Sequence, residues 1–263
     1  MTSPPDIVRH SADGAELDAF LVPWDTDIFG FPVAQISQLD LGPPGTSSSA
    51  VFDSFETWCS SHDVRLVSCR LDHTRIRESM ELEAHGFRFV EIVYEPRRDG
   101  LGDVPSPGHD IEVTDATQAD LPAIAAIAAT AFTTGRFLLD PRLPPDLSHR
   151  RYASWVRSAF TAPPQRVLKA ESAGELVGFF IVERRDDASV YWHLTAVAPE
   201  QQGRGIGLSL WRTMLRRHAA EGATFVETTI SGHNLAAINL YARLGFAFPS
   251  AGMTLHRFVD RAS

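Results

Sequence analysis

Gln202-Gly-Arg-Gly-Ile-Gly207 is the most informative segment of this chain. It stands between an apolar run that ends at Ala196-Val197 and a helical pattern from about Leu208 to Ala220. Glycines at alternate positions let the backbone turn tightly, so that several N–H groups can point into one concavity at the start of a helix. Such a concavity binds phosphate groups.

The spacing of these glycines separates this loop from other phosphate-binding loops. It reads G-x-G-x-G and no lysine follows, so it fits neither the Rossmann fingerprint nor the P-loop. A glycine-rich surface turn is the alternative for three glycines taken alone. The whole stretch from Leu194 to Gly207 resembles the acetyl-CoA signature of the GNAT acetyltransferase superfamily, Q/R-x-x-G-x-G/A, which implies that the loop binds the diphosphate of acetyl-CoA.

A second pattern follows the helix. Thr224 to Ile230 is rich in β-branched residues and predicts a strand, and apolar residues from Leu235 to Leu244 then predict an amphipathic helix. Asn234 and Tyr241 are two helical turns apart and therefore lie on one face. They resemble the N-x6-Y-x3-G-F pattern of GNAT enzymes, which implies a CoA-contacting asparagine and a tyrosine proton donor.

The resemblance thus implies one catalytic residue, Tyr241, and no metal. The residues that it implies for acetyl-CoA binding are Thr195, Ala196, Val197, Gln202, Gly203, Arg204, Gly205, Ile206, Gly207, Leu208 and Asn234.

Acyl transfer from a thioester to an amine explains why a tyrosine suits this position. The leaving thiolate needs a proton, and a phenol with an ordinary pKa of about 10 can supply it at neutral pH. A strand N–H near Val197, freed by Pro199 and the loop, would stabilise the oxyanion. Considered alone, Tyr241 could equally be a core aromatic.

The sequence leaves the general base open. His193 lies in the predicted strand from Ser189 to Val197, on the face of Tyr191, Thr195 and Val197 if the alternation is regular. The glutamate that other members place five residues before the asparagine is replaced here by Thr229, with Glu227 on the same side. The candidates are therefore His193, Glu227 and a relay through water.

The composition of the chain excludes several classes of function. Its 263 residues carry a net charge of −9, which disfavours nucleic acid and anionic lipid as partners. The two cysteines, Cys59 and Cys69, form neither a disulfide framework nor a metal-ligand spacing. No signal peptide or membrane span is recognisable. A cytoplasmic, bacterial protein is expected, and a homodimer is left open.

We predict an α/β (α+β) chain in which a GNAT fold, a mixed sheet flanked by helices, follows a truncated GNAT-like domain. Residues 1–98 would form the first domain, 99–110 a linker rich in glycine and proline, and 111–263 the acetyltransferase domain. In that last domain we expect, in order, a strand near Ile111, helices at 117–131 and 146–160, and strands near 166, 177 and 190. The glycine loop and its helix, a strand, a helix, and strands near 247 and 254 should follow.

An internal repeat motivates the truncated first domain. Val64–Phe89 aligns without gaps on Ala223–Phe248, so that Gly86-Phe87 matches Gly245-Phe246. Arg75 and Leu82 replace Asn234 and Tyr241 in the first copy, which indicates a half without the cofactor site. A coincidental likeness of two strand-helix-strand units is the alternative.

The choice of amine rests on looser motifs. Trp24 to Phe31, Phe132 to Asp140 and Tyr152 to Trp155 together resemble the TDP-fucosamine acetyltransferase group, which implies a nucleotide-linked amino sugar as substrate. Such a ligand needs aromatic and cationic side chains, and the candidates are Trp24, Phe29, Arg136, Arg142, Arg150 and Arg151. An N-terminal protein amine, or a non-catalytic acyl-CoA sensor, are the other interpretations.

Overall fold

The computed structural model describes residues 6–259. It divides into two compact units. The central unit comprises residues 93–250, and the terminal unit combines the chain before residue 93 with the chain after residue 250. Each unit has a sheet and a core of its own.

The central unit is built on a mixed sheet with the strand order β6-β11-β10-β9-β8-β7. Its strands are β6 (Arg97–Asp99), β7 (Glu112–Asp115), β8 (Arg166–Ser172), β9 (Glu175–Arg184), β10 (Ser189–Val197) and β11 (Phe225–Thr228). Its helices are α4 (Leu121–Ala131), α5 (Arg136–Leu139), α6 (Pro145–Ala159), α7 (Ile206–Ala220) and α8 (Leu235–Arg243), with 3₁₀ turns η1 (Leu101–Asp103) and η2 (Pro199–Gln201). Only β10 and β11 are parallel neighbours in this sheet.

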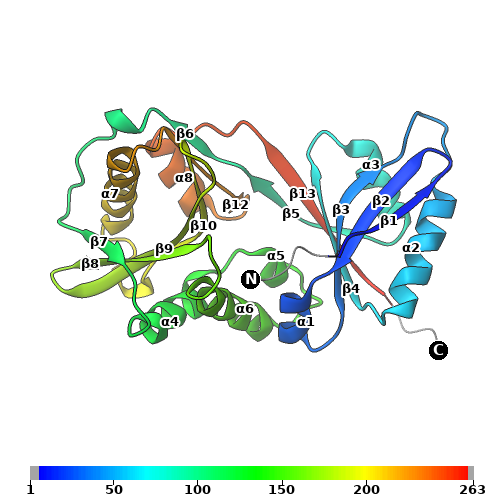
Figure 1. The fold of residues 1–263 in the computed structure, drawn as a ribbon, viewed down its shortest axis with the longest axis horizontal. Helices are drawn as coiled ribbons and strands as arrows, with labels where there is room; N and C mark the ends of the chain where they lie inside the picture. Colours follow the sequence, from blue (N-terminus) through cyan, green and yellow to red (C-terminus); the bar gives the residue numbers. More distant parts are fainter. Residues whose placement is uncertain (1–5, 260–263) are drawn as a thin grey trace. The chain divides into compact units, whose positions relative to one another are not determined.

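Helices cover both faces of the central sheet because its strands alternate their apolar side chains. Phe180 and Trp192 belong to the cluster packed under α7 and α8, whereas Phe179 and Ile181 belong to the cluster under α4 and α6. In Figure 1, α7 lies on one side of the sheet and α4 and α6 lie on the other. The predicted mixed sheet flanked by helices is confirmed.

A bulge reverses the alternation within β10. The pairing of β10 with β9 shifts register between Trp192 and Leu194, so His193 is the extra residue. Val190 and Trp192 face α7 and α8 before the bulge, but Leu194 and Ala196 face α4 and α6 after it. The sequence predicted one regular face for the whole strand, and the inserted residue is the physical reason why that prediction is wrong beyond His193.

The terminal unit contains the strand order β1-β2-β3-β4-β13-β5. Its elements are β1 (Val8–Ala12), β2 (Ala15–Leu21), α1 (Pro23–Phe29), β3 (Val33–Asp40), α2 (Ser49–Ser61), β4 (Leu66–Asp72), α3 (Ile76–Ala84), β5 (Arg88–Tyr94) and β13 (Ala251–Phe258). A core around Phe52, Phe55 and Phe87 lies between its helices and its sheet. The last two residues of β5 count with the central unit, where they pair with β12 (Ile230–Ser231).

The internal repeat is visible as repeated structure. At the register of the sequence alignment, α3 and α8 begin and end at matching residues, and Gly86 and Gly245 after them both adopt positive φ angles, +83° and +75°. The strand before each helix has a parallel neighbour on one side, β3 beside β4 and β10 beside β11. Its other neighbour is antiparallel, β13 beside β4 and β6 beside β11.

The units do not follow the contiguous division expected from the sequence. The expected linker begins at the end of β6, which extends the central sheet, and continues through Leu101 and Val104, both buried in the central core. The expected last domain loses β13, which pairs with β4 over seven residues of the terminal unit. Glycine and proline content indicated a linker, but two apolar anchors make this segment part of the fold. The strand expected near 247 is a single bridge between Ala247 and Arg97.

Cys59 and Cys69 are free and buried in the terminal unit, and burial raises the pKa of each thiol to about 12. Within residues 6–259, no helix has the length and apolar character needed to cross a bilayer.

Candidate active site

The glycine loop has the backbone conformation that its sequence predicts. Gly203 and Gly205 adopt φ angles of +75° and +80°, in the left-handed region that side chains disfavour. Gly205 is the N-cap of α7, and no side chain caps the first turn of this fifteen-residue helix in the described structure. The amides of that turn therefore remain available to an anion, which the helix dipole also favours.

The loop is held against the end of β10. The carboxamide of Gln202 donates to the Val197 carbonyl at 3.2 Å. A Cβ added to Gly207 would lie 3.7 Å from the Val197 side chain and 3.8 Å from that of Leu240. Gly207 thus brings the start of α7, the end of β10 and helix α8 to one place, whereas Gln202 and Arg204 remain exposed at the surface.

A fork in the sheet lies beside this loop. The parallel pairing of β10 with β11 ends at Trp192 and Thr228, and the Thr228 hydroxyl ties the last rung by donating to the Trp192 carbonyl at 2.8 Å. Beyond it, Leu194 to Val197 pair with β9 alone. The edge of β10 that carried the parallel ladder therefore presents backbone groups without a partner strand, where Val197 was expected to supply an oxyanion donor.

Tyr241 reaches this fork from α8. The residue is 1% exposed and packs between the rings of Trp192, Trp211 and Phe246. Burial raises the pKa of its phenol, and the neighbouring polar groups of Trp211, Thr195 and Thr228 oppose that rise. The phenol is thus protonated at neutral pH, the form that a proton donor requires.

Asn234 has a structural task in the described chain. It is the N-cap of α8, and its side-chain oxygen accepts a hydrogen bond from the Ala237 amide at 3.0 Å. Such a cap stabilises a helix by about 1 kcal/mol. The predicted contact with CoA would have to use the rest of its carboxamide.

The two candidate bases lie in different environments. His193 approaches the Glu183 carboxylate on β9, with 2.7 Å between Nε2 and Oε2. Burial lowers the pKa of His193, while the hydrogen bond to Glu183 opposes this effect. Glu227 instead forms an ion pair with Arg97 at 3.0 Å, and Arg97 also binds Asp99. The Arg97 guanidinium thus occupies an oxygen of the Glu227 carboxylate.

Two further residues, Glu183 and His109, lie beside the site and were not predicted from the sequence. Glu183 could not be predicted because a strand glutamate ten residues before a histidine has no local sequence signature. His109 was not predicted because it lies in the segment interpreted as a linker. In the structure its ring lies 3.5 Å from the Cβ position of Gly205 and hydrogen-bonds to Ser209 on α7 at 2.9 Å. Its proximity to a glycine loop could have been found only from the fold.

The residues proposed for substrate recognition are partly accounted for by local packing. Tyr152 stacks on Phe132 with centroids 4.5 Å apart, and Trp155 meets His193 edge-on at 6.2 Å. Arg142 is bound to buried Asp140 through two hydrogen bonds of 2.8 Å.

Other candidates for substrate recognition are arginines and aromatic residues of α1, α5 and α6. Arg136 and Arg151 lie over the Phe137 ring. Trp24, in α1 of the terminal unit, is 47% exposed, and Phe29 is buried. Between residues 6 and 259 no group of three metal-binding side chains occurs.

Residues 128–246 match the model of the acetyltransferase (GNAT) family. This span contains α6, the fork, the glycine loop and α8. The chain carries a GNAT acetyltransferase domain. The predicted family and the prediction of an N-acetyltransferase are thereby confirmed.

Two curated relatives are similar over different lengths. The spore coat polysaccharide biosynthesis protein SpsD of Bacillus subtilis is 29% identical over 127 residues, which are 48% of this chain and 44% of SpsD. The dTDP-fucosamine acetyltransferase of Escherichia coli O6:H1 is 27% identical over 196 residues, 73% of this chain and 81% of that enzyme. The matched region thus spans less than half of SpsD and four fifths of the second relative.

A solved structure extends the likeness of fold to almost the whole chain. A GCN5-related N-acetyltransferase from Sphaerobacter thermophilus superposes with a TM-score of 0.67 at 17% identity, covering 94% of this chain and 81% of that one. The likeness of fold therefore includes residues of both units.

Proposed function

We propose that this GNAT domain transfers the acetyl group of acetyl-CoA to a primary amine, and that the amine belongs to a nucleotide-linked amino sugar. The observation that carries the proposal is the convergence, at one fork of the sheet, of a glycine loop suited to a diphosphate and a buried tyrosine hydroxyl. These features come from elements far apart in the sequence, so their meeting is not a consequence of local propensity.

The residues that would hold acetyl-CoA fit it by their backbone chemistry. The amides from Gly203 to Leu208 would receive the diphosphate, and the unpaired edge of β10 from Thr195 to Val197 would lie along the pantetheine. Bound there, acetyl-CoA supplies the activated acyl group. The chain needs no further cofactor for this chemistry.

Groups of the protein itself would then carry out the acetyl transfer. A backbone N–H near Val197 stabilises the charge that develops on the acyl oxygen. Tyr241 donates its proton to the departing sulfur, since it is buried and protonated at neutral pH. The polar side chains of Thr195 and Thr228 lie near the hydroxyl, at the point where β10 and β11 separate.

The choice of an amino sugar rests on similarity and on the character of the α5–α6 region. The E. coli relative is named for a dTDP-amino sugar, and the Bacillus relative for polysaccharide biosynthesis. Arg136 and Arg151 together with Trp155 give this region the cationic and aromatic side chains that a nucleotide diphosphate would engage. The cytoplasmic location and a homodimer remain predictions.

The terminal unit is proposed to be a partial GNAT-like half without a cofactor site. Its parallel pair β3–β4 and antiparallel neighbour β13 support this, because they repeat the arrangement around β11. The turn between β3 and α2 carries no Gly-x-Gly-x-Gly run, and Leu82 stands where α8 has Tyr241.

The test is an acceptor panel with purified full-length chain. CoA release from acetyl-CoA is measured with a dTDP-4-amino sugar, the same sugar without its nucleotide, a peptide with a free N-terminus and a buffer control. We expect release with the nucleotide sugar and at least tenfold less with the free sugar. Reaction with the peptide alone would identify a protein N-terminal acetyltransferase. Binding of acetyl-CoA without release to any acceptor would identify a sensor.

A further inference from the structure

His193 and Tyr241 lie on opposite faces of β10. Tyr241 contacts Trp192 and lies near Thr195, both on the face covered by α7 and α8. His193 instead meets Trp155 of α6 with ring centroids 6.2 Å apart, on the opposite face. In a regular strand Thr195 would share the face of His193, so the inserted residue is what brings Thr195 to the side of Tyr241.

The imidazole of His193 is fixed by one strong contact. Its Nε2 lies 2.7 Å from a carboxylate oxygen of Glu183, and the side chains are 16% and 24% exposed. An ionised carboxylate only accepts hydrogen bonds, so Nε2 carries the proton in this pair. The lone pair of the neutral ring is consequently on Nδ1. The arrangement is that of a carboxylate that orients a base and stabilises its charged form.

The surroundings of His193 contain few other charges. Arg185, the residue after β9, lies 3.8 Å over the Tyr191 ring and lowers the pKa of His193. Tyr191 meets the histidine edge-on at 4.8 Å and hydrogen-bonds to the Thr229 hydroxyl at 2.7 Å. From α6 the neighbour is the uncharged Trp155, with Arg151 5.6 Å from its ring. Glu227 on β11, opposite Tyr191, is neutralised by Arg97. Glu183 is therefore the charge that acts most directly on His193.

We propose that His193 is the general base that accepts a proton from the acceptor amine on Nδ1, and that Glu183 is the residue that positions it. This role rests on the proposed acetyl transfer and extends it to a group that the sequence left unassigned. The base and the acid then act from opposite faces of β10. An amine would approach from the side of α6, where Trp155 and Tyr191 flank the histidine.

The protons balance in this scheme. An acceptor that arrives as an ammonium ion gives one proton to Nδ1 of His193, which Glu183 stabilises as an imidazolium before the proton passes to solvent. The freed nitrogen lone pair forms the bond to the acyl carbon, and the carbon–sulfur bond breaks. Sulfur takes the proton of Tyr241, and the second proton of the acylated nitrogen restores the tyrosine. The products are an amide, a free thiol and one proton.

The experiment compares pH profiles of kcat/KM for full-length His193→Gln and Glu183→Gln with the wild type, using the best acceptor of the amine panel. Matched controls are His62→Gln, at an exposed residue just after α2, and Glu112→Gln, at an exposed residue of β7. Acetyl-CoA affinity and the melting temperature are measured for every variant, so that a fold defect is recognised. Ionisation of the acceptor amine is common to all variants and cancels in the comparison.

We expect His193→Gln to lower kcat/KM by about 10² and to remove the acidic limb attributable to the enzyme, with acetyl-CoA affinity within twofold of wild type. Glu183→Gln should move that limb to lower pH, because the carboxylate that raises the pKa of His193 is gone. If Glu183 had only a structural role, Glu183→Gln would change the rate but would not shift the acidic limb of the pH profile.

Failure of the base assignment and failure of the proposed function would give different results. An active wild type whose kcat/KM and acidic limb are unchanged in His193→Gln would overturn the base assignment and leave acetyl transfer intact. A wild type that acetylates no member of the panel would overturn the proposed function and this role with it.

Discussion

Tyr241 is the residue that we propose as the catalytic acid. It is fully enclosed by Trp192, Trp211 and Phe246, so the sequence-based alternative of a core aromatic describes its ring correctly. Its hydroxyl, however, lies among the polar groups of Thr195 and Thr228. The ring is part of the core and the hydroxyl faces the fork, which explains why burial and function do not conflict here.

Tyr241→Phe should retain the fold and lose turnover. The substitution keeps the ring and removes only the proton donor, so we expect kcat to fall by about 10² while the acetyl-CoA Kd changes less than threefold. Stopped-flow turnover and calorimetric titration measure the two quantities. Wild-type turnover in this variant would exclude Tyr241 as the acid.

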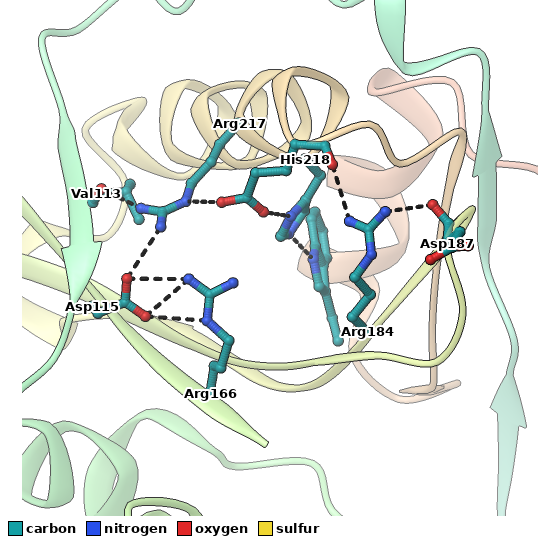
Figure 2. Close-up of polar contacts among 9 residues, drawn as sticks. Val113, Asp115, Arg166, Arg184, Asp187, Arg217 and His218 are labelled. Atoms are coloured by element: carbon teal, nitrogen blue, oxygen red, sulfur yellow. Dashed lines mark hydrogen bonds and ion pairs between the residues drawn. The ribbon is translucent and has the colours of Figure 1, made fainter. Parts of the chain in front are cut away.

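His218 is a buried imidazole that has no part in the acetyl transfer proposed above. Trp192 donates its indole N–H to Nε2 of His218 at 3.0 Å, and Nδ1 lies 3.4 Å from Glu221. Figure 2 shows His218 beside the ion pairs that link Arg217, Asp115 and Arg166. Burial lowers the pKa of His218 to about 4. A proton on Nε2 would also oppose the indole N–H with a second donor.

Stability should therefore fall on mild acidification. With a folded pKa of about 4 and an unfolded pKa of 6.5, the unfolded chain binds the proton first, so stability is lost as the pH falls through this window. Between pH 7 and 5 the expected loss from His218 is about 2 kcal/mol. Urea unfolding of His218→Gln should show a correspondingly shallower loss, with exposed His62→Gln as the control. Equal pH dependence in wild type and His218→Gln would contradict the assignment.

At the scale of elements, the loop between β10 and α7 depends on two left-handed glycines. Gly205→Ala leaves open space around its new Cβ apart from the His109 ring at 3.5 Å, but φ at +80° is costly for alanine by about 1 kcal/mol. We expect the loop to relax away from this conformation and acetyl-CoA affinity to fall at least tenfold. Calorimetry measures this. Unaltered affinity would show that the loop does not bind the diphosphate.

Strand β9 contains a glycine of a different kind. A Cβ on Gly178 would lie 2.5 Å from the Ala196 carbonyl oxygen and 2.9 Å from Leu210, so β9, β10 and α7 could not keep their spacing. Gly178→Ala should lower the melting temperature by several degrees, an effect typical of overpacking by 1–3 kcal/mol. Gly102→Ala, where no atom lies within 4 Å, is the matched control. Equal melting temperatures would refute the close approach.

Most elements around the site could be predicted from sequence because their signals are local. Helix α8 has an apolar periodicity, an asparagine cap and a C-terminal glycine, and it begins where the pattern predicted. The bulge at His193 and the contact with Glu183 could not be predicted, since both depend on how β10 pairs with β9. Alternation alone placed Thr195 on the wrong side relative to His193.

Across the whole molecule, segments that are neighbours in the chain do not always belong to the same structural unit. The sequence repeat correctly indicated a second strand-helix-strand unit, and the matching limits of α3 and α8 support it. It could not indicate that β13 belongs to the terminal unit or that β6 belongs to the central one, because an antiparallel partner from a distant segment leaves no periodic signal.

Removal of residues 251–263 should therefore damage the terminal unit. Strand β13 pairs with β4 from Gly252 to Phe258, and Leu255 is buried in the core that contains Phe52. We expect hydrogen exchange in β4 and β5 to accelerate at least tenfold in the truncated chain, while β9 and β10 keep their protection. Exchange monitored by mass spectrometry measures this, and unchanged protection of β4 would contradict the assignment of β13.

A crystal structure of the full chain with bound CoA would show where the diphosphate and the sulfur lie. We expect the diphosphate on the amides between Gly203 and Leu208, and the sulfur within hydrogen-bonding reach of the Tyr241 hydroxyl. A diphosphate bound at any other place, or a sulfur remote from that hydroxyl, would contradict the proposed acetyl transfer.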